Sequence, residues 1–419
     1  MDVRPPRVAL FTDSYHDVSG VARTCRNFED YALRRQLPLL MVRAGRRTSL
    51  SDHGSMQALE LRRGPLSIPL DTGLWFDPCA MRHAGRAESA VRAFAGELIH
   101  VTSPGDMGIL GVRTARRMGI PLVASWHTNL HEFAARRLAK WMPLPPAAAR
   151  RRLAAMVECA CLSALIRFYR MADLLLAPNR SLIRLLAERT GKSVYAMDRG
   201  VRTDIFSPRF RRRNDDAFVL GYAGRLRPEK NLRMLVDVEQ ALLAAGEVNY
   251  RFLLVGDGSE RAYLERRLIR AEFTGFLEGE ALAAAFAGMD LFVFPSETDT
   301  YGNVILEAMA SGVPVLVTSR GGPQELVQPG RTGFVAEDAA GFCEAIRTLM
   351  HNPSLHSRMR HAARLQACGM SWDRVFDDVY QAYARLRTGR FADAASALRR
   401  RPGFILNPPG RGSHADGRA

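Results

Sequence analysis

The sequence lacks any run of about 18 apolar residues, so no membrane-spanning helix is expected. Its six cysteines show neither C-x-x-C nor the Cys/His spacing of a metal site, which predicts free thiols in a reducing cytosol. The first residues hold too short an apolar stretch for a secretory signal. A G-x-G-x-x-G pattern is also missing, which argues against NAD binding. What remains is a globular composition, 47% hydrophobic and 24% charged.

Charge of one sign predominates. The 59 basic and 43 acidic residues give a net charge of +16, and Arg carries most of it. Such a surface attracts polyanions, namely nucleic acid, anionic lipid or phosphorylated substrates. One hypothesis is therefore a non-catalytic, Arg-rich protein that binds nucleic acid or a membrane. No nucleic-acid-binding module and no interleaving of aromatic and basic residues supports it, so no nucleic-acid partner is expected.

The order of apolar segments predicts the fold class. A chain of 419 residues is long for one core. Short apolar runs alternate with helical patterns, starting at Val8 to Phe11 and again at Val219 to Tyr222. This alternation predicts an α/β protein with two parallel, doubly wound sheets. The charged segment RFRRRNDDA, residues 209–217, is expected to link two domains, and residues 44–80, which contain Gly, Pro and Ser, are expected to be irregular.

Residues 291–312, LFVFPSETDTYGNVILEAMASG, carry the clearest functional pattern. The pattern predicts a buried strand, a polar loop and a short helix with Asn303 as N-cap and Gly312 at its end. Two carboxylates bracket the turn, Asp299 in the loop and Glu307 one helical turn in. A helix N-terminus binds phosphate, and carboxylates accept hydrogen bonds from hydroxyls. Phosphate next to a polyhydroxyl is the chemistry of a nucleotide-sugar.

This stretch resembles the acid-x7-Glu motif of the retaining family-4 glycosyltransferases of GT-B fold, including the run EAMASGVPV that follows. The family usually has Glu as the first acid, whereas this sequence has Asp299; Glu297 lies two residues out of register. The resemblance extends over roughly residues 7 to 385. It implies two Rossmann-like domains with a cleft between them. The expected divisions are an N-terminal acceptor-side domain (1–208), the linker (209–217), a C-terminal nucleotide-sugar domain (218–371), a helix crossing back to the first domain (372–390) and a basic tail (391–419).

Four further residues complete the expected site. Arg225 and Lys230 flank a Pro-containing turn with G-R-x-x-x-x-K spacing. A departing nucleoside diphosphate gains negative charge, which, without a metal, needs fixed cations and backbone donors. Gly20, in the loop after the first strand, is either an ordinary turn residue or, as the resemblance implies, faces the donor phosphates. His127 follows the strand Pro121 to Ser125 in a segment resembling the family's HTN motif, which implies contact with the donor sugar or the acceptor.

The resemblance implies a role for each residue. Arg225 and Lys230 hold the pyrophosphate, Asp299 binds sugar hydroxyls, and Glu307 binds the ribose. The expected catalytic residues are His127, Arg225, Lys230 and Asp299. The expected donor-binding residues are Gly20, Arg225, Lys230, Asp299, Gly302, Asn303, Val304 and Glu307. No metal or other cofactor is expected, because no D-x-D cluster occurs. The predicted reaction moves a hexose, with mannose favoured, from GDP-mannose to a lipid or glycan acceptor; UDP-glucose is the alternative donor.

Several features stay open at this level. Residues 131–152 place basic side chains beside Trp141 and Met142, which fits either a membrane surface or a solvated helix face. Glu325 resembles a family position but equally fits a cap of its local turn. Arg202 stands where the family usually has Asp. The tail is expected to be disordered. The expected location is the cytoplasm, with peripheral contact with the inner face of an anionic membrane as a further hypothesis.

Overall fold

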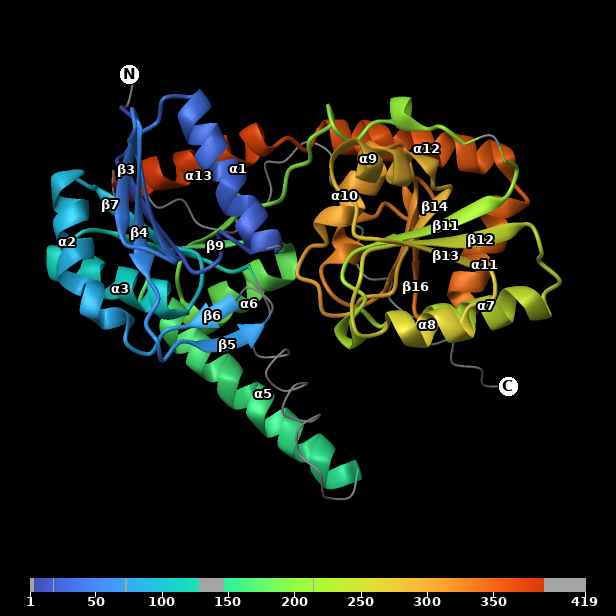
Figure 1. Ribbon diagram of the computed structural model, residues 1–419, viewed down its shortest axis with the longest axis horizontal. Helices are drawn as coiled ribbons and strands as arrows, with labels where there is room; N and C mark the ends of the chain where they lie inside the picture. The colour runs from blue at the N-terminus through green and yellow to red at the C-terminus, as the bar shows by residue number, and fades with distance from the viewer. Residues whose placement is uncertain (1–3, 18, 72–73, 128–146, 214, 388–419) are drawn as a thin grey trace, which may run out of the picture.

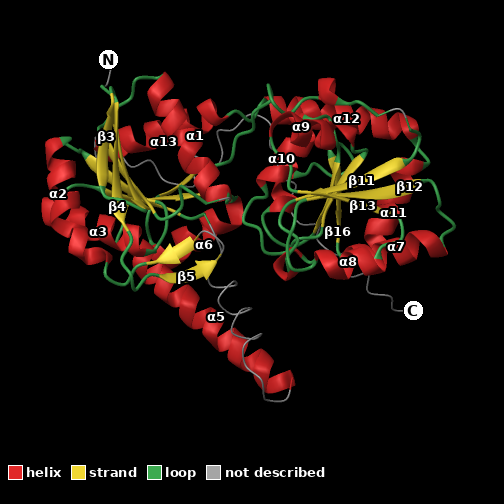
Figure 2. Cartoon of the chain, viewed as in Figure 1, coloured by secondary structure: helices red, strands yellow, loops and turns green. Residues whose placement is uncertain are grey.

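The computed structural model describes residues 4–17, 19–71, 74–127, 147–213 and 215–387. The chain forms two lobes, each a mostly or fully parallel sheet between layers of helices (Figures 1 and 2). We call them the N-terminal and C-terminal lobes. Within the described ranges, no helix combines the length and apolar character needed to cross a membrane. The basic segment 131–152 is described only from residue 147, and the tail 391–419 lies outside the described residues.

The N-terminal lobe contains an eight-stranded sheet in the order β10-β9-β8-β7-β1-β2-β4-β3. Its central strand β1 pairs in parallel with β2 and β7, so that Val8 lies opposite both Leu39 and Leu98. Strands buried on both faces read as continuous apolar runs, which is why these segments are visible in the sequence. The strands are β1 (Val8–Thr12), β2 (Leu39–Gly45), β3 (Ser49–His53), β4 (Met56–Arg62), β7 (Leu98–Val101), β8 (Leu122–Ser125), β9 (Leu174–Ala177) and β10 (Val194–Ala196).

Helices cover both faces of this sheet. On one face, Phe11 belongs to a buried cluster with side chains of α2, α3, α5 and α6. On the other face, α1 and α13 pack together, and the rings of Phe28 and Phe376 lie 4.9 Å apart edge to face. The last described helix of the chain therefore packs on the first lobe. The helices are α1 (Gly20–Arg34), α2 (Ala84–Ala93), α3 (Asp106–Met118), α5 (Ala147–Tyr169), α6 (Arg180–Thr190) and α13 (Trp372–Arg387), with a short 3-10 helix η1 (Ala80–His83).

The C-terminal lobe contains a six-stranded, all-parallel sheet in the order β13-β12-β11-β14-β15-β16. Its strands are β11 (Phe218–Ala223), β12 (Tyr250–Val255), β13 (Ala271–Gly275), β14 (Leu291–Phe294), β15 (Val315–Thr318) and β16 (Gly333–Ala336). Its helices are α7 (Met234–Ala244), α8 (Arg261–Arg267), α9 (Gly279–Gly288), α10 (Asn303–Ala310), α11 (Ala339–Met350) and α12 (Pro353–Cys368), with 3-10 turns η2 (Pro208–Phe210), η3 (Pro228–Lys230) and η4 (Pro323–Leu326). Both lobes thus have the predicted doubly wound α/β class.

The expectation that residues 44–80 are irregular is wrong. This stretch contains β3 and β4, which extend the main sheet, and a separate hairpin of β5 (Ile68–Asp71) and β6 (Leu74–Phe76). The edge strand β3 runs antiparallel to β4 and is mostly exposed, with the sequence SLSDH. An exposed edge strand has no apolar run, so its sequence looks like a loop.

Candidate functional site

The N-termini of two helices, one from each lobe, meet at the candidate site. α1 begins at Gly20 and is capped by Ser19, whose Oγ accepts a hydrogen bond from the Ala22 N–H at 3.1 Å. α10 begins at Asn303, and no side chain caps it. A Cβ atom built on Gly20 would lie 3.3 Å from Nδ2 of the Asn303 side chain, so this side chain lies against the start of α1. Figure 1 shows α1 and α10 on the facing sides of the lobes. Two positive helix ends at one point favour an anion.

The start of α10 corrects one expectation. Asn303 is not the N-cap; that position belongs to Gly302, whose φ of 82° is in the left-handed region. Glycine adopts this conformation without steric cost, whereas other residues do so rarely. The helix therefore starts without an acceptor side chain over its first amides, and Val304 lies half-buried in the first turn. The first turn of α10, which contains Asn303 and Val304, thus starts at the contact with Gly20 of α1.

The two acids of the motif each bind a cation. Lys230, in the turn after β11, donates to both oxygens of Asp299, at 2.7 and 2.8 Å. Burial raises the pKa of Asp299, but the charge and hydrogen bonds of Lys230 outweigh burial, so that the pKa lies below its ordinary value. Glu307, in α10, is 5% exposed and pairs with Arg23 of α1 across the two lobes. Asp299 is therefore ionised, and each of the two carboxylates has a cationic partner in the site.

Arg225 lies close to this pair. It lies two residues after the end of β11, and its positive charge helps to lower the pKa of Asp299. Its backbone carbonyl accepts a hydrogen bond from the Tyr222 hydroxyl at 3.1 Å, which fixes the turn. The structure therefore brings Arg225, Lys230 and Asp299 together.

His127 lies at the end of β8, buried, within a chain of polar groups. Its Nδ1 accepts from Arg199 Nη2 at 2.8 Å, and its Nε2 lies 2.7 Å from Ser125 Oγ. Arginine can only donate, so the ring proton is on Nε2 and points at Ser125. Burial, followed by the charge of Arg199, lowers the pKa of His127 well below its ordinary value, so the ring is neutral. Any contact between a His127 ring nitrogen and substrate requires one of these hydrogen bonds to open.

The same polar chain continues through the sheet. Ser125 Oγ also lies 2.8 Å from His100 Nε2, and the Tyr383 hydroxyl lies 2.7 Å from His100 Nδ1. Tyr383 belongs to α13, so the returning helix is connected to His127 by hydrogen bonds. No sequence motif predicts this chain of hydrogen bonds, because its residues are far apart in the sequence and none of them belongs to a recognisable pattern.

Backbone and side-chain hydrogen bonds join the lobes beside the two acids. Thr300, next to Asp299, donates from Oγ1 to the His127 carbonyl at 2.9 Å, and its own carbonyl accepts from Asn179 Nδ2 at 2.6 Å. A Cβ on Gly322 would lie 1.9 Å from the Thr300 carbonyl oxygen, so only glycine fits there. These contacts place the Asp299 loop against the strand end that carries His127.

Glu325 does not cap its own turn. Its carboxylate accepts from the N–H groups of Arg180 and Ser181, at 2.8 and 3.2 Å, and from Ser181 Oγ at 2.8 Å. It therefore caps the N-terminus of α6 in the other lobe, with a sign of charge that suits the helix dipole. Arg202, the second open position, pairs with Asp204 at 2.7 Å on the surface.

Comparisons with known proteins identify the family of this chain. The glycosyltransferase family 4 profile matches residues 18–205, and the glycosyl transferases group 1 profile matches residues 217–352. A GDP-mannose-dependent alpha-mannosyltransferase of Mycobacterium tuberculosis is 34% identical over 316 residues, which cover 73% of this chain and 77% of the relative. The chain belongs to glycosyltransferase family 4. This membership excludes the hypothesis of a non-catalytic, Arg-rich protein, because the chain is a glycosyltransferase.

More distant relatives support the fold of this glycosyltransferase. The sulfoquinovosyl transferase SQD2 of Arabidopsis thaliana is 27% identical, and the match covers 97% of this chain and 77% of that one. Among solved structures, a sucrose-phosphate synthase from Thermosynechococcus elongatus superposes with a TM-score of 0.70 at 19% identity, covering 92% of this chain and 100% of that chain. Anabaena HepE in complex with UDP and glucose gives 0.62 at 17% identity, covering 90% and 99%. The fold is GT-B.

Proposed function

We propose that this enzyme transfers mannose from GDP-mannose, with retention of configuration and without a metal, to a lipid or glycan acceptor. The relatives at 34% and 35% identity are GDP-mannose-dependent alpha-mannosyltransferases, which supports the donor. The observation that carries the proposal is the meeting of the α1 and α10 N-termini next to the Lys230–Asp299 pair. This arrangement offers backbone donors and fixed cations to a diphosphate, with carboxylates beside it for hydroxyls.

Each residue has a distinct task in this proposal. The diphosphate sits at the junction of Gly20 and Asn303, with the amide of Val304 beside it. Lys230 and Arg225 neutralise the charge that develops on the leaving phosphate as the sugar–oxygen bond breaks. The leaving phosphate oxygen accepts the proton of the incoming hydroxyl on the same face of the sugar, which retains its configuration.

The carboxylates and His127 position the donor sugar. Asp299 and Glu307 accept hydrogen bonds from the sugar and ribose hydroxyls, respectively, and hold the reacting carbon in place. His127, fixed by Arg199 and Ser125, forms the N-terminal-lobe wall next to the sugar.

The donor is tested by the melting temperature of the full chain with GDP, UDP or ADP. A ligand that binds only the folded state stabilises it by about 2.7 kcal/mol at a concentration of 100 times its Kd. We expect GDP to raise the melting temperature by several degrees and GDP-mannose to be turned over. A shift with UDP alone would replace GDP-mannose by UDP-glucose, and a shift with none of the three would overturn the assignment of the site.

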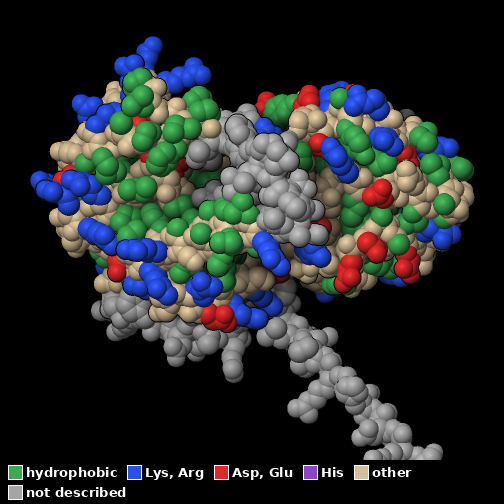
Figure 3. All heavy atoms as spheres, turned by 90° about the horizontal axis from the view of Figure 1, so that it is seen from below, with side chains coloured by type: hydrophobic (Ala, Val, Ile, Leu, Met, Phe, Trp, Pro, Cys, Tyr) green, Lys and Arg blue, Asp and Glu red, His purple; other side chains and the backbone are tan. Residues whose placement is uncertain are grey.

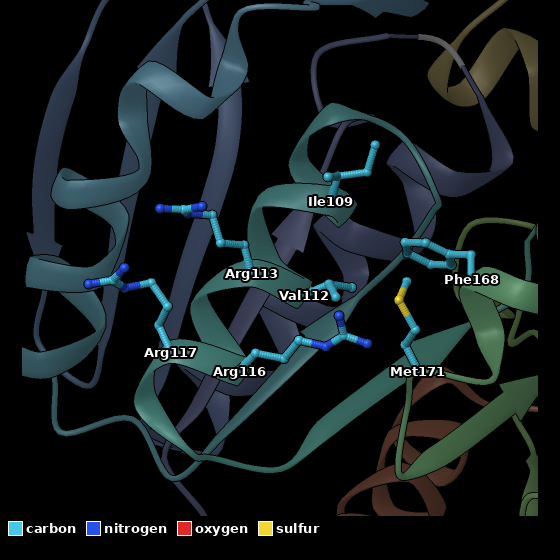
Figure 4. Close-up of a pocket in the computed structure, with 7 residues that line it drawn as sticks. All are labelled: Ile109, Val112, Arg113, Arg116, Arg117, Phe168 and Met171. Carbon is cyan, nitrogen blue, oxygen red and sulfur yellow. The ribbon is translucent and has the colours of Figure 1, made fainter.

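The N-terminal lobe has a surface suited to contact with an anionic membrane, where a lipid-linked acceptor would lie. Figure 3 shows hydrophobic and basic side chains mixed on the underside of this lobe. A groove of about 320 Å³ lies between α3 and the end of α5. Figure 4 shows Ile109 and Val112 of α3 facing Phe168 and Met171. The groove is rimmed by Arg113, Arg116 and Arg117. Apolar side chains amid arginines fit a membrane that carries negative charge.

Several elements of the N-terminal lobe expose large apolar side chains. Ile109 is 42% exposed, and further examples on nearby elements are Leu66, Ile68, Trp75, Met81 and Met156. A peripheral position at the cytoplasmic face of the membrane would bring the enzyme to a lipid-linked acceptor. Exposed apolar surface beyond scattered single residues marks interaction sites, which is the basis of this part of the proposal.

Vesicle sedimentation tests this placement. The double variant Arg113→Gln/Arg116→Gln should bind vesicles with anionic phosphatidylglycerol several-fold less than the natural protein does. Arg266→Gln/Arg267→Gln on α8 of the C-terminal lobe, with the same charge change on exposed residues, should leave binding unchanged. Equal binding of the natural protein to neutral and anionic vesicles would refute the membrane proposal, while leaving the donor assignment intact.

A further inference from the structure

The contact between α1 and α10 is a seam of two successive pairs. Gly20 meets Asn303 at the helix ends. One turn further along both helices, Arg23 pairs with Glu307. Arg23 follows Gly20 by three residues and Glu307 follows Asn303 by four, so the two helices run side by side with their N-termini together. The guanidinium therefore lies only about one helical turn, 5.4 Å, from the helix ends where a diphosphate would bind.

Glu307 and Arg23 differ in their freedom to move. The Glu307 side chain is 5% exposed, and within the described residues Arg23 is the partner of its carboxylate. The Arg23 side chain is 43% exposed, and Glu307 is its one hydrogen-bond partner among the described residues. A buried carboxylate needs a donor at all times, because leaving it unpaired costs several kcal/mol. A half-exposed arginine, in contrast, can swing to another anion without breaking the core.

The two hydroxyls of ribose and the guanidinium of Arg23 compete for Glu307. We propose that Arg23 is an exchanging diphosphate ligand that selects nucleoside diphosphates against nucleosides. When ribose hydroxyls bind Glu307, the Arg23 side chain leaves this carboxylate. It then moves about one helical turn toward the N-terminus of α1 and contacts the diphosphate. Each charge then keeps a partner: Glu307 accepts from hydroxyls, and Arg23 donates to phosphate oxygens. A nucleoside without phosphates displaces Arg23 but offers it no new anion, so it binds poorly. This inference rests on the proposed donor site.

The test uses two ligands whose affinities are expected to change in opposite directions. Arg23→Met keeps the apolar stem of the side chain and removes its charge and donors. Competition against a fluorescent GDP analogue measures the affinities of GDP and guanosine for the full chain. GDP affinity should fall about tenfold, because a charge-assisted contact is lost. Guanosine affinity should rise about threefold or more, because Glu307 no longer has to give up an ion pair.

Controls separate this role from a structural one. Arg35→Met, at the other end of α1, should change neither affinity, and Arg23→Lys should recover part of the GDP affinity. If Arg23→Met lowers both affinities, or changes neither, the inference is wrong even though the donor site stands. If GDP fails to bind the natural protein, the proposed function itself fails. A crystal structure with GDP gives a direct check: Arg23 should contact a phosphate oxygen, and an Arg23 still paired with Glu307 would overturn the exchange.

Discussion

Removing Lys230 while keeping Asp299 should damage both stability and turnover, and the two effects can be separated. In Lys230→Met, Asp299 loses both of its hydrogen bonds from Nζ and stays 23% exposed in a site between the lobes. Breaking a buried ion pair by removing one partner costs about 3–5 kcal/mol, and the partial exposure of both side chains reduces this to about 2–3 kcal/mol. For a lobe of this size we expect the melting temperature to fall by roughly 5–10 °C.

The pH dependence gives the sign of this effect. Lys230 holds the pKa of Asp299 below its ordinary value, so in the natural protein the ionised pair adds stability that is lost as the pH falls toward that pKa. Without Lys230, burial is opposed by the weaker effects of the Ser296 hydrogen bond and the Arg225 charge, so the pKa of Asp299 rises and protonation relieves the unpaired charge. The melting-temperature deficit of Lys230→Met should therefore be largest at pH 8 and shrink toward pH 5.

A second substitution isolates the unpaired charge. Lys230→Met/Asp299→Asn removes both charges while keeping the shape, which is close to neutral for stability, so its melting temperature should return to within about 2 °C of the natural value. In both variants, turnover should be roughly 100-fold or more below that of the natural protein, because the leaving phosphate loses its fixed cation.

Scanning calorimetry from pH 5 to 8 and initial rates with GDP-mannose measure both effects. Lys192→Met on the surface after α6 is the matched control and should change neither quantity. If the double variant melts no higher than Lys230→Met, or if Lys230→Met keeps full turnover, the role assigned to this ion pair is refuted.

Two further predictions concern the buried Asp13 and the half-buried Glu325. Burial, followed by the hydrogen bond and charge of Asp106, raises the pKa of Asp13 well above its ordinary value, so the stability that protonated Asp13 contributes is lost as the pH rises. In a thermal-shift assay, Asp13→Asn should therefore raise the melting temperature more at pH 8 than at pH 5. An equal change at both pH values would contradict this prediction. Glu325→Gln weakens the cap that joins η4 to α6. If this costs about 1 kcal/mol of lobe closure, the KM for the donor should rise by about three- to tenfold. An unchanged KM would show that this cap does not hold the lobes together.

The sequence determined those parts of the protein that depend on local pattern. The apolar runs at β1, β11 and β14 are buried on both faces, and such burial forces continuous hydrophobic sequence wherever a parallel strand occurs. The fold class could therefore be predicted. The D-x7-E and G-R-x-x-x-x-K spacings likewise placed Asp299 and Lys230 in loops at strand ends, where a parallel sheet presents its ligand-binding edge.

Local pattern failed where solvent or an unusual backbone conformation decided the outcome. The edge strand β3 is polar because water covers it, so nothing in its sequence distinguishes it from a loop. The start of α10 was predicted one residue off, because a left-handed Gly302 took the capping position that Asn303 could have filled. Both errors concern features that surrounding structure selects.

Only the tertiary structure decided which distant residues meet. Arg23 and Glu307 are separated by 284 residues, and Arg180 and Glu325 by 145, so no period or spacing along the chain connects them. Their pairing depends on how the two lobes dock, which brings the N-termini of α1 and α10 together and aims α6 at the opposite lobe. Helical and strand periodicity reports only whether a face is buried, not which surface covers it, and that is why the ion pairs between lobes were invisible until the fold was known.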